Sequence, residues 1–481
     1  MAERRFKTAV RNAANKAVPR LFVGNYDCAY GMSGSWGHTG YHQHLAYEDE
    51  GDFSLYIPSY GRDRECGDLS LGTYQFTGSM QLHGKLPLME LDVRNLEIGG
   101  LTWMPYKSRN FQQEHNAETF RTGLRRLAVQ SVILGGGFHY FNLYQQWACT
   151  PKALESLKDM FRIAAYARPA PLDRNRIAVF LDEHSDMFAN THPGWIPGFF
   201  NFKNIPSMAV QRTGVPFNYF LVSDVLHKDF EAPGVLFFAD AATLKPETIA
   251  EIRRRYGKDK RVIVWHGAPG FLAESDIGKI SRAVGFNLQD MPGNNDSKPA
   301  SFDSNYDLVS PDEPHKSPLF TVDSSDPLLK GVRGFFMQES IVVPHIYSPH
   351  WAVVDPEAVP LAVFAGTDKV GMAVKRYSDH TEVFIGQPGS VTPVLLRNFA
   401  REAGIAPALE TGDLFMAGSS LIAVGASTGD GIRKVRKPAN CRKVTALAGH
   451  RIIREDAEYF EFFLTHRDFA VFAVEFNDTA N

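Results

Sequence analysis

Three charged side chains occur at every second position around residue 90. The segment 82–95 reads LHGKLPLMELDVRN, an apolar run that leads into Glu90, Asp92 and Arg94. Because side chains alternate between the two faces of a strand, these three share one face. A neighbouring carboxylate and guanidinium tune the pKa of a carboxylate and hold its rotamer, which a glycosidase nucleophile needs. The alternative is a structural ion cluster at the mouth of a barrel.

The elements that must position these side chains are strands that alternate with helices. Residues 1–168 carry short apolar runs that end in polar, aromatic or glycine-rich loops. Such alternation implies a parallel sheet with crossover connections, and barrels of this kind hold catalytic groups at the carboxyl ends of their strands. We expect strands within Arg20–Tyr26, Asp52–Tyr60, Lys85–Arg94 and Ala128–Leu143.

A second α/β domain is expected over residues 172–405, after the Pro169-Ala170-Pro171 boundary. Nearly unbroken apolar runs predict buried parallel strands, and helical segments between them indicate a doubly wound sheet. Residues 288–325 are polar and read as a surface excursion, whereas residues 406–481 alternate in short strands and predict a small β-sandwich. The expected strands are Arg176–Asp182, Phe217–Val222, Gly234–Ala239, Arg261–His266, Ala362–Phe364, Gly371–Arg376 and Thr381–Gly386, with helices at Pro246–Tyr256 and Thr392–Ala403.

Composition excludes several classes of function. The 481 residues carry a net charge of −3, so no basic field attracts nucleic acid or an anionic membrane. The sequence contains no apolar run long enough to span a bilayer, and the basic first 20 residues lack the hydrophobic region of a secretory signal. They predict a surface helix, with an organelle-targeting peptide as the alternative. The four cysteines form no C-x-x-C pair, which argues against a structural zinc site. We expect a cytoplasmic protein.

Five segments follow one another in a distinctive order: FVGNYDCAYG, GHTGYHQHL, DFSLYIPSYGRDRECG, HGKLPLMELDVRN and GGGFHYFNLYQQW. This order resembles that of the corresponding segments in glycoside hydrolase family 42 β-galactosidases. Residues 175–405 resemble the β-galactosidase trimerisation domain, through VSDVL, LFFADAATL and IVWHGAPG. The resemblance implies three parts: the last four strands of a (β/α)₈ TIM barrel over 1–168, an amidotransferase-like trimerisation domain over 172–405, and the C-terminal β-sandwich over 406–481.

The resemblance also implies roles for individual residues. Glu90 stands at the seventh-strand position of the nucleophile, where Asp92 and Arg94 would orient it and keep it ionised. The substrate would be a carbohydrate, no cofactor would be needed, and the assembly would be a homotrimer. Asn142 stands where relatives often carry Asp, and other tryptophans that could stack on a sugar are Trp36 and Trp103. Substrate-binding residues would be His38, Tyr60, Arg62, Asp92, Arg94, Asn142 and Trp147.

The general acid/base has no counterpart in this resemblance. The first recognisable strand matches the fifth of the barrel, whereas the acid/base glutamate belongs to the fourth. Retaining hydrolysis needs two carboxyl groups about 5–5.5 Å apart, and no motif favours Asp27, Glu48 or Asp63 as the second. A separate N-terminal half-barrel chain, an upstream start or a truncated gene product would account for this. We expect little or no hydrolase activity from the isolated chain. The alternative function is a non-catalytic carbohydrate-binding or assembly protein.

Four further motifs are given structural interpretations. His38, His42 and His44 could supply two ligands to a metal, but no third is indicated. The glycines at 135–137 are expected to follow a strand and permit close backbone approach rather than bind phosphate. The elbow at 265–270 contains no cysteine, so amidotransferase chemistry is disfavoured. The polar run Asp182-Glu183-His184 fits a loop at the end of a strand.

Overall fold

The computed structural model describes most of the chain from residue 205 onward and shorter stretches before it. The described residues are 9, 12, 13, 16, 24–27, 53–56, 76–91, 117–140, 150–168, 173–182, 184, 185, 205–291, 319–322, 325–333 and 351–477. They fall into two compact units, one that joins the elements before residue 171 to residues 408–477 and one that spans 173–407. The four described residues near the N-terminus, Ala9, Asn12, Ala13 and Lys16, are helical and exposed, in line with the predicted surface helix.

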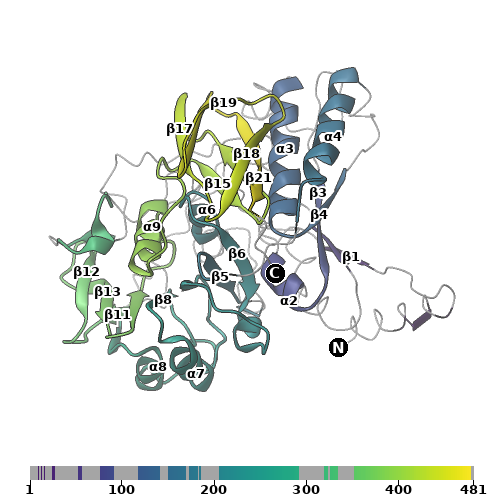
Figure 1. Cartoon of the computed structure of the whole chain (residues 1–481). Coiled ribbons are helices and arrows are strands. Elements are labelled where there is room, and N and C mark those ends of the chain that lie inside the picture. Colours follow the sequence, from purple (N-terminus) through teal and green to yellow (C-terminus); the bar gives the residue numbers. More distant parts are fainter. Residues whose placement is uncertain are drawn as a thin grey trace, which may run out of the picture. The chain divides into compact units, whose positions relative to one another are not determined.

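The first unit opens with four parallel strands that lie side by side in chain order (Figure 1). They are β1 (Gly24–Asp27), β2 (Phe53–Tyr56), β3 (Leu86–Leu91) and β4 (Gly137–Tyr140), and the helices among them are α2 (Thr77–Leu82), α3 (Ala117–Ile133) and α4 (Pro151–Ala164). Strands that stay in sequence order while all run one way require each crossover to advance in the same direction. Barrels of alternating strands and helices are wound in this way.

The fourth predicted strand is wrong over most of its length. Ala128–Leu143 contains the last turns of α3, followed by β4 after a three-residue turn. Both α3 and β4 belong to or pack on one apolar core, so the apolar run continues across two elements of different type. Continuous burial removes the polar positions that would have distinguished a period of 3.6 from a period of two.

The glycine turn 135–137 therefore follows a helix, not a strand, and lies at the amino end of β4. Gly135 has a φ of 86°, a conformation that L-residues with a Cβ rarely adopt. A Cβ on Gly136 would lie 2.5 Å from the carbonyl oxygen of Pro87 and 2.9 Å from Ser131 Oγ. The predicted close backbone approach is present, and it brings the turn against β3.

Two antiparallel sheets follow residue 408. The first is ordered β15 (Leu414–Ala417), β16 (Leu421–Gly425), β21 (Phe469–Phe476) and β18 (Cys441–Leu447), and the second β17 (Gly431–Arg436), β20 (Tyr459–Leu464) and β19 (Ile452–Glu455). A core that includes Phe460, Phe462 and Phe472 lies between them. The opposite face of the first sheet packs on α3 through Leu414, Leu421 and Val471. Because both faces of β16 and β21 are covered, their sequences are apolar at nearly every position.

The second unit is built on a ten-stranded mixed sheet. Its parallel part is ordered β6 (Phe217–Leu221), β5 (Ile177–Leu181), β7 (Val235–Phe238), β8 (Arg261–His266) and β14 (His380–Ile385), and antiparallel strands β13 (Val370–Arg376), β12 (Val359–Phe364) and β10 (Leu319–Thr321) continue it. Strands β9 (Leu288–Asp290) and β11 (Trp351–Val353) pair beside β13. Helices are α6 (Ile205–Val210), α7 (Pro246–Tyr256), α8 (Ile277–Val284) and α9 (Pro393–Glu402), with 3₁₀ turns η7 (Val222–Leu226) and η9 (Pro327–Leu329).

Most strands predicted in this unit are found within a residue or two of the expected bounds. Helix α7 spans the predicted residues, and α9 starts where the Thr392 side chain accepts a hydrogen bond from the amide of Leu395. The predicted excursion over 288–325 needs correction, because β9 and β10 at its two ends are strands of the sheet.

Candidate active site

Glu90 lies on the face of the parallel sheet that is turned away from α3. Its neighbours in β3, Met89 and Leu91, belong to the apolar core that contains the buried side of α3. Since side chains alternate along a strand, Glu90 projects to the opposite face. Its side chain is enclosed, with 1% of its surface exposed. A carboxylate in such a place meets a lower dielectric than water, which strengthens its interactions with charge.

His139 of β4 stands directly opposite Glu90 in the sheet. The two residues are paired in the parallel register, so their side chains leave the same face. The residues on either side of the histidine, Phe138 and Tyr140, pack against the core on the other face. Unlike Glu90, His139 is exposed. The sequence analysis did not single out this histidine, although apolar residues flank it in the alternation that marks a half-buried strand.

Of the eight site residues predicted from the sequence, Glu90 alone lies among the residues that the structure describes. Asp92 and Arg94 follow the last described residue of β3, so their sharing of a face with Glu90 stays a prediction. The remaining predicted residues also lie outside the described part of the chain: His38, Tyr60, Arg62, Asn142 and Trp147, together with Trp36, Trp103 and the three histidines at 38, 42 and 44.

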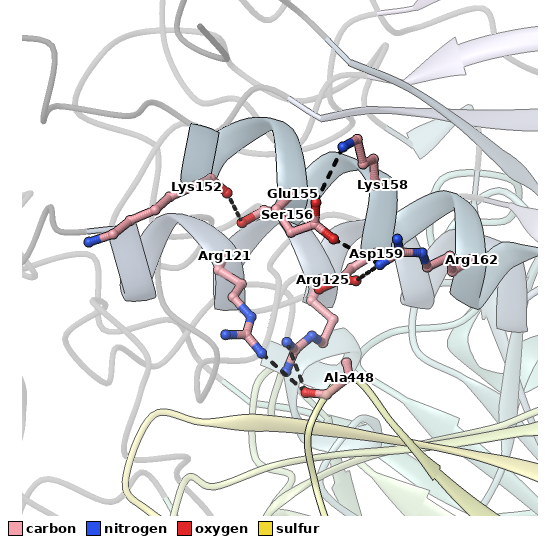
Figure 2. Close-up of polar contacts among 9 residues, drawn as sticks. All are labelled: Arg121, Arg125, Lys152, Glu155, Ser156, Lys158, Asp159, Arg162 and Ala448. Atoms are coloured by element: carbon pink, nitrogen blue, oxygen red, sulfur yellow. Dashed lines mark hydrogen bonds and ion pairs between the residues drawn. The ribbon is translucent and has the colours of Figure 1, made fainter. Parts of the chain in front are cut away.

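Two arginines of α3 tie the helix behind β3 to the C-terminal sheets. Arg121 Nη2 donates to the carbonyl oxygen of Ala448 at 3.1 Å, and Arg125 donates to the same oxygen at 3.5 Å and to that of Phe469 at 2.9 Å. Figure 2 shows both guanidinium groups converging on Ala448. Ala448 has a φ of 54°, and its turn leads to His450, whose Nε2 lies 2.8 Å from Asp468 Oδ2.

At this junction between α3 and the C-terminal sheets, Asp468 is an acidic group close to His450 and Arg125. Burial raises the pKa of Asp468, but the hydrogen bond and charge of His450, with the charge of Arg125, outweigh it and leave the pKa below its ordinary value. The outer side of α4 is different, because Glu155, Lys158, Asp159 and Arg162 pair there at the surface (Figure 2). Solvent screens those pairs, so the arginines of α3 hold the elements behind Glu90 more firmly than the ion pairs of α4 do.

The elbow after β8 holds a histidine with both ring nitrogens engaged. His266 Nδ1 lies 2.7 Å from the carbonyl oxygen of Ala239, and the amide of Gly389 donates to Nε2 at 2.8 Å. The second contact requires a lone pair on Nε2, so Nδ1 carries the proton. Burial lowers the pKa of His266 to about 4, although the bond to Ala239 opposes it. The elbow residues with positive φ are Gly267 and Gly270, and neither offers a nucleophile.

Asp182, at the end of β5, uses its carboxylate to hold a loop. One oxygen accepts from the Thr243 amide at 2.6 Å, and the other accepts from the Thr243 hydroxyl at 2.8 Å and from the amide of His184 at 3.0 Å. A carboxylate that accepts several such bonds closes the turn between neighbouring strands. This geometry agrees with the loop interpretation of the polar run 182–184.

Neither metal ligation nor membrane crossing is indicated in the part of the chain that the structure describes. Its histidines, cysteines and carboxylates include no group of three placed to hold an ion. No helix there combines the length and apolar character needed to cross a bilayer. A surface pocket lined by Gln289, Asp290, Phe364 and Lys369 belongs to the second unit, not to the sheet that carries Glu90.

Comparison with solved structures identifies the fold. No family model matches the sequence, and no curated protein does. The β-galactosidase of the Antarctic haloarchaeon Halorubrum lacusprofundi superposes with a TM-score of 0.60 at 12% identity, over 98% of this chain and 66% of that one. The β-galactosidase of Bacillus circulans gives a TM-score of 0.57 with the same identity and coverage. A catalytic mutant of Gan42B, a GH42 β-galactosidase from G. stearothermophilus, gives 0.53 at 11% identity, over 98% and 67% of the two chains.

The chain therefore has a fold like that of family 42 β-galactosidases, which confirms the resemblance at the level of structure. It spans about two thirds of the length of these proteins.

Proposed function

We propose that the chain forms part of a β-galactosidase-like retaining glycoside hydrolase in which Glu90 is the nucleophile. The observation that carries the proposal is a buried glutamate next to the carboxyl end of β3, on the face of a parallel sheet that is turned away from α3, in a chain with this fold. Enzymes built on such sheets bring their reacting groups to the carboxyl ends of the strands.

In this mechanism a carboxylate oxygen of Glu90 attacks the anomeric carbon of the sugar. The glycosidic C–O bond breaks, the leaving oxygen takes a proton from a general acid, and a glycosyl ester remains on Glu90. Water, deprotonated by the same group, then attacks the anomeric carbon and releases the sugar with retained configuration. Asp92 and Arg94 orient Glu90, and the sugar pocket is lined by His38, Tyr60, Arg62, Asn142 and Trp147.

The acid/base and the remaining barrel strands come from additional β/α units. Within the described residues β1 and β4 each pair with one strand, whereas every strand of a closed barrel pairs with two. Beside β4, helix α4 leaves Leu154 and Phe161 47% and 65% exposed, and Phe138 of β4 lies 5.4 Å from the Phe161 ring. An apolar stripe on a barrel helix is where the next helix packs. A separate N-terminal half-barrel chain could pack on this exposed apolar surface of α4.

Trapping the glycosyl-enzyme tests the role of Glu90 without requiring the acid. A 2,4-dinitrophenyl 2-deoxy-2-fluoro-β-galactoside has a leaving group that departs unprotonated, while its fluorine slows hydrolysis of the ester. We expect the purified chain to release dinitrophenolate in a burst and to gain one fluorosugar mass on the peptide that contains Glu90. Gluco- and fuco-configured analogues, run in parallel, report which sugar is accepted.

Two variants make the trapping result specific. Glu90→Gln keeps the shape of the side chain but has no nucleophile, so the label should disappear. Glu357→Gln changes a carboxylate with an 84% exposed side chain and should label like the wild type. Stoichiometric label on another residue, or no label with any sugar, would refute the proposal. The second result would favour a non-catalytic carbohydrate-binding or assembly protein.

Completion of the barrel has a separate test. Co-expression with the polypeptide encoded directly upstream should raise turnover of unactivated aryl-galactosides well above that of the isolated chain. Phe161→Asp should weaken the effect, because it places a charge on the apolar stripe of α4, whereas Lys158→Asp on the charged side should not. The trimerisation-like second unit leads us to propose a homotrimer, to be checked by light scattering of the purified protein.

A further inference from the structure

His139 is the one side chain that β4 presents on the face shared with Glu90. The strand consists of Gly137, Phe138, His139 and Tyr140, and its two aromatic residues pack against the core on the other face. Gly137 points the same way as His139 but has no side chain, and a Cβ there would meet Leu88 Cδ2 at 2.8 Å. On the face shared with Glu90, β4 therefore presents the imidazole of His139 beside the backbone of Gly137.

Glu90 and His139 differ in their exposure to solvent. Glu90 is almost fully enclosed, whereas His139 is open to solvent. The sheet on this side thus changes within one pair from an enclosed carboxylate to an accessible polar ring. His139 is therefore an accessible polar group beside the enclosed carboxylate on this face of β3 and β4.

The spacing suits a single sugar residue. Neighbouring strands lie about 4.8 Å apart, and paired side chains of a parallel ladder leave their strands at the same level. A pyranose whose anomeric carbon faces the Glu90 carboxylate therefore brings ring hydroxyls within reach of the imidazole. A neutral imidazole offers one donor and one acceptor, which matches the two hydrogen-bonding modes of a hydroxyl.

We propose that His139 binds a hydroxyl of the same sugar residue that Glu90 attacks. The proposal rests on the function proposed above, because Glu90 defines where the sugar lies. His139 has no bond-making role in it, and it sets affinity for a sugar with a hydroxyl at the contacted position. It is a binding residue of the reacting subsite that lies on a different strand from the nucleophile.

The concentration dependence of trapping measures this contact. The rate of fluorosugar labelling saturates, and its half-saturating concentration reports affinity while its limiting rate reports the chemistry of Glu90. We expect His139→Ala to raise the half-saturating concentration about tenfold, the loss of roughly one hydrogen bond, with a limiting rate within about twofold of the wild type. His139→Gln, which retains a donor and an acceptor, should recover part of the affinity. His466→Ala, at an exposed histidine between β20 and β21, is the matched control.

The outcomes separate the two proposals. Deoxy analogues of the probe identify the contacted hydroxyl, because the one that lacks it should label wild type and His139→Ala with equal half-saturation. If Glu90 is labelled but both His139 variants saturate like the wild type, the contact does not exist and the function stands. If Glu90 is never labelled, the function and this inference fail together. Circular dichroism of both variants checks that the fold is retained, and the glutamine variant serves if the alanine variant does not fold.

Discussion

Arg125 of α3 and Phe469 of β21 are joined by a hydrogen bond across 344 residues of sequence. Arg125 is 1% exposed, and its guanidinium donates at 2.9 Å to the backbone carbonyl, so a buried charged group is part of the core between helix and sheet. The same helix packs on Met89 and Leu91 of β3. The C-terminal strands therefore support, through α3, the strand that carries Glu90.

Arg125→Met should destabilise the first unit by about 2–3 kcal/mol. The methionine replaces the apolar stem but leaves the Phe469 carbonyl without its buried partner, which costs about 1–3 kcal/mol in typical cases. Urea denaturation followed by circular dichroism measures the change. Arg162→Met, at a side chain 64% exposed on α4, should cost less than about 0.5 kcal/mol. Equal losses in the two variants would contradict a special role for Arg125.

Asp413→Asn should be among the most damaging conservative substitutions in the C-terminal sheets. Asp413 is fully buried and lies 2.5 Å from Nε of Arg433, whose side chain is 4% exposed. Burial raises the pKa of Asp413, but the hydrogen bonds from Arg433, Thr411 and Thr428 outweigh it and lower the pKa overall.

Removing that charge leaves the Arg433 guanidinium buried without its counterion, which costs about 3–5 kcal/mol. The comparison is Glu475→Gln, in a pair with Arg442 where both side chains are about half exposed. Its cost should stay under about 1 kcal/mol. Thermal unfolding of both variants decides the matter, and a small loss for Asp413→Asn would mean that water replaces the carboxylate.

The second unit should lose stability as pH rises past neutrality because of His380. Burial lowers the pKa of this histidine, but hydrogen bonds and charges from Glu382 and Asp379 outweigh it, so the folded pKa lies above its ordinary value. A group with a raised pKa stabilises the fold fully below its unfolded pKa of about 6.5, and the contribution disappears as pH climbs through the folded pKa.

His380 contacts Asp379 and Glu382, and the Tyr377 ring stacks on its ring with centroids 4.3 Å apart. Arg253 is the cation that pairs with Glu382. Denaturation midpoints between pH 5.5 and 8.5 should therefore fall more steeply for the wild type than for His380→Gln. Parallel slopes in the two proteins would show that the histidine does not couple folding to protons.

Gly136→Ala should disturb the turn that approaches β3. The new Cβ would lie 2.5 Å from the backbone oxygen of Pro87, so main chain must move, and overpacking of this kind costs about 1–3 kcal/mol. Because Pro87 lies three residues before Glu90, labelling of Glu90 should slow as well. Gly84→Ala meets no atom within 4 Å and bears only the strain of a φ of 63°, about 1 kcal/mol. Labelling of that variant should remain normal.

The sequence predicted regular elements best where their ends are chemically marked. Helix α7 starts at Pro246 and was predicted over its full length, since proline favours the first turn of a helix. Strand β8 coincides with the apolar run Arg261–His266. The junction of α3 and β4 was mispredicted because burial on both sides makes helix and strand equally apolar. His139 went unnoticed because a lone histidine in a short strand carries no motif.

By itself the amino-acid sequence determined most strands of the second unit, helix α7, the resemblance to β-galactosidases and the choice of Glu90 as a candidate, because periodicity and local motifs are properties of neighbours in the chain. Only the tertiary structure decided that Glu90 is enclosed, that His139 stands opposite it, and that β15, β16 and β21 share a core with α3. These relations join residues 49 to more than 300 positions apart. Strand register and helix packing create them, and local sequence patterns do not record either.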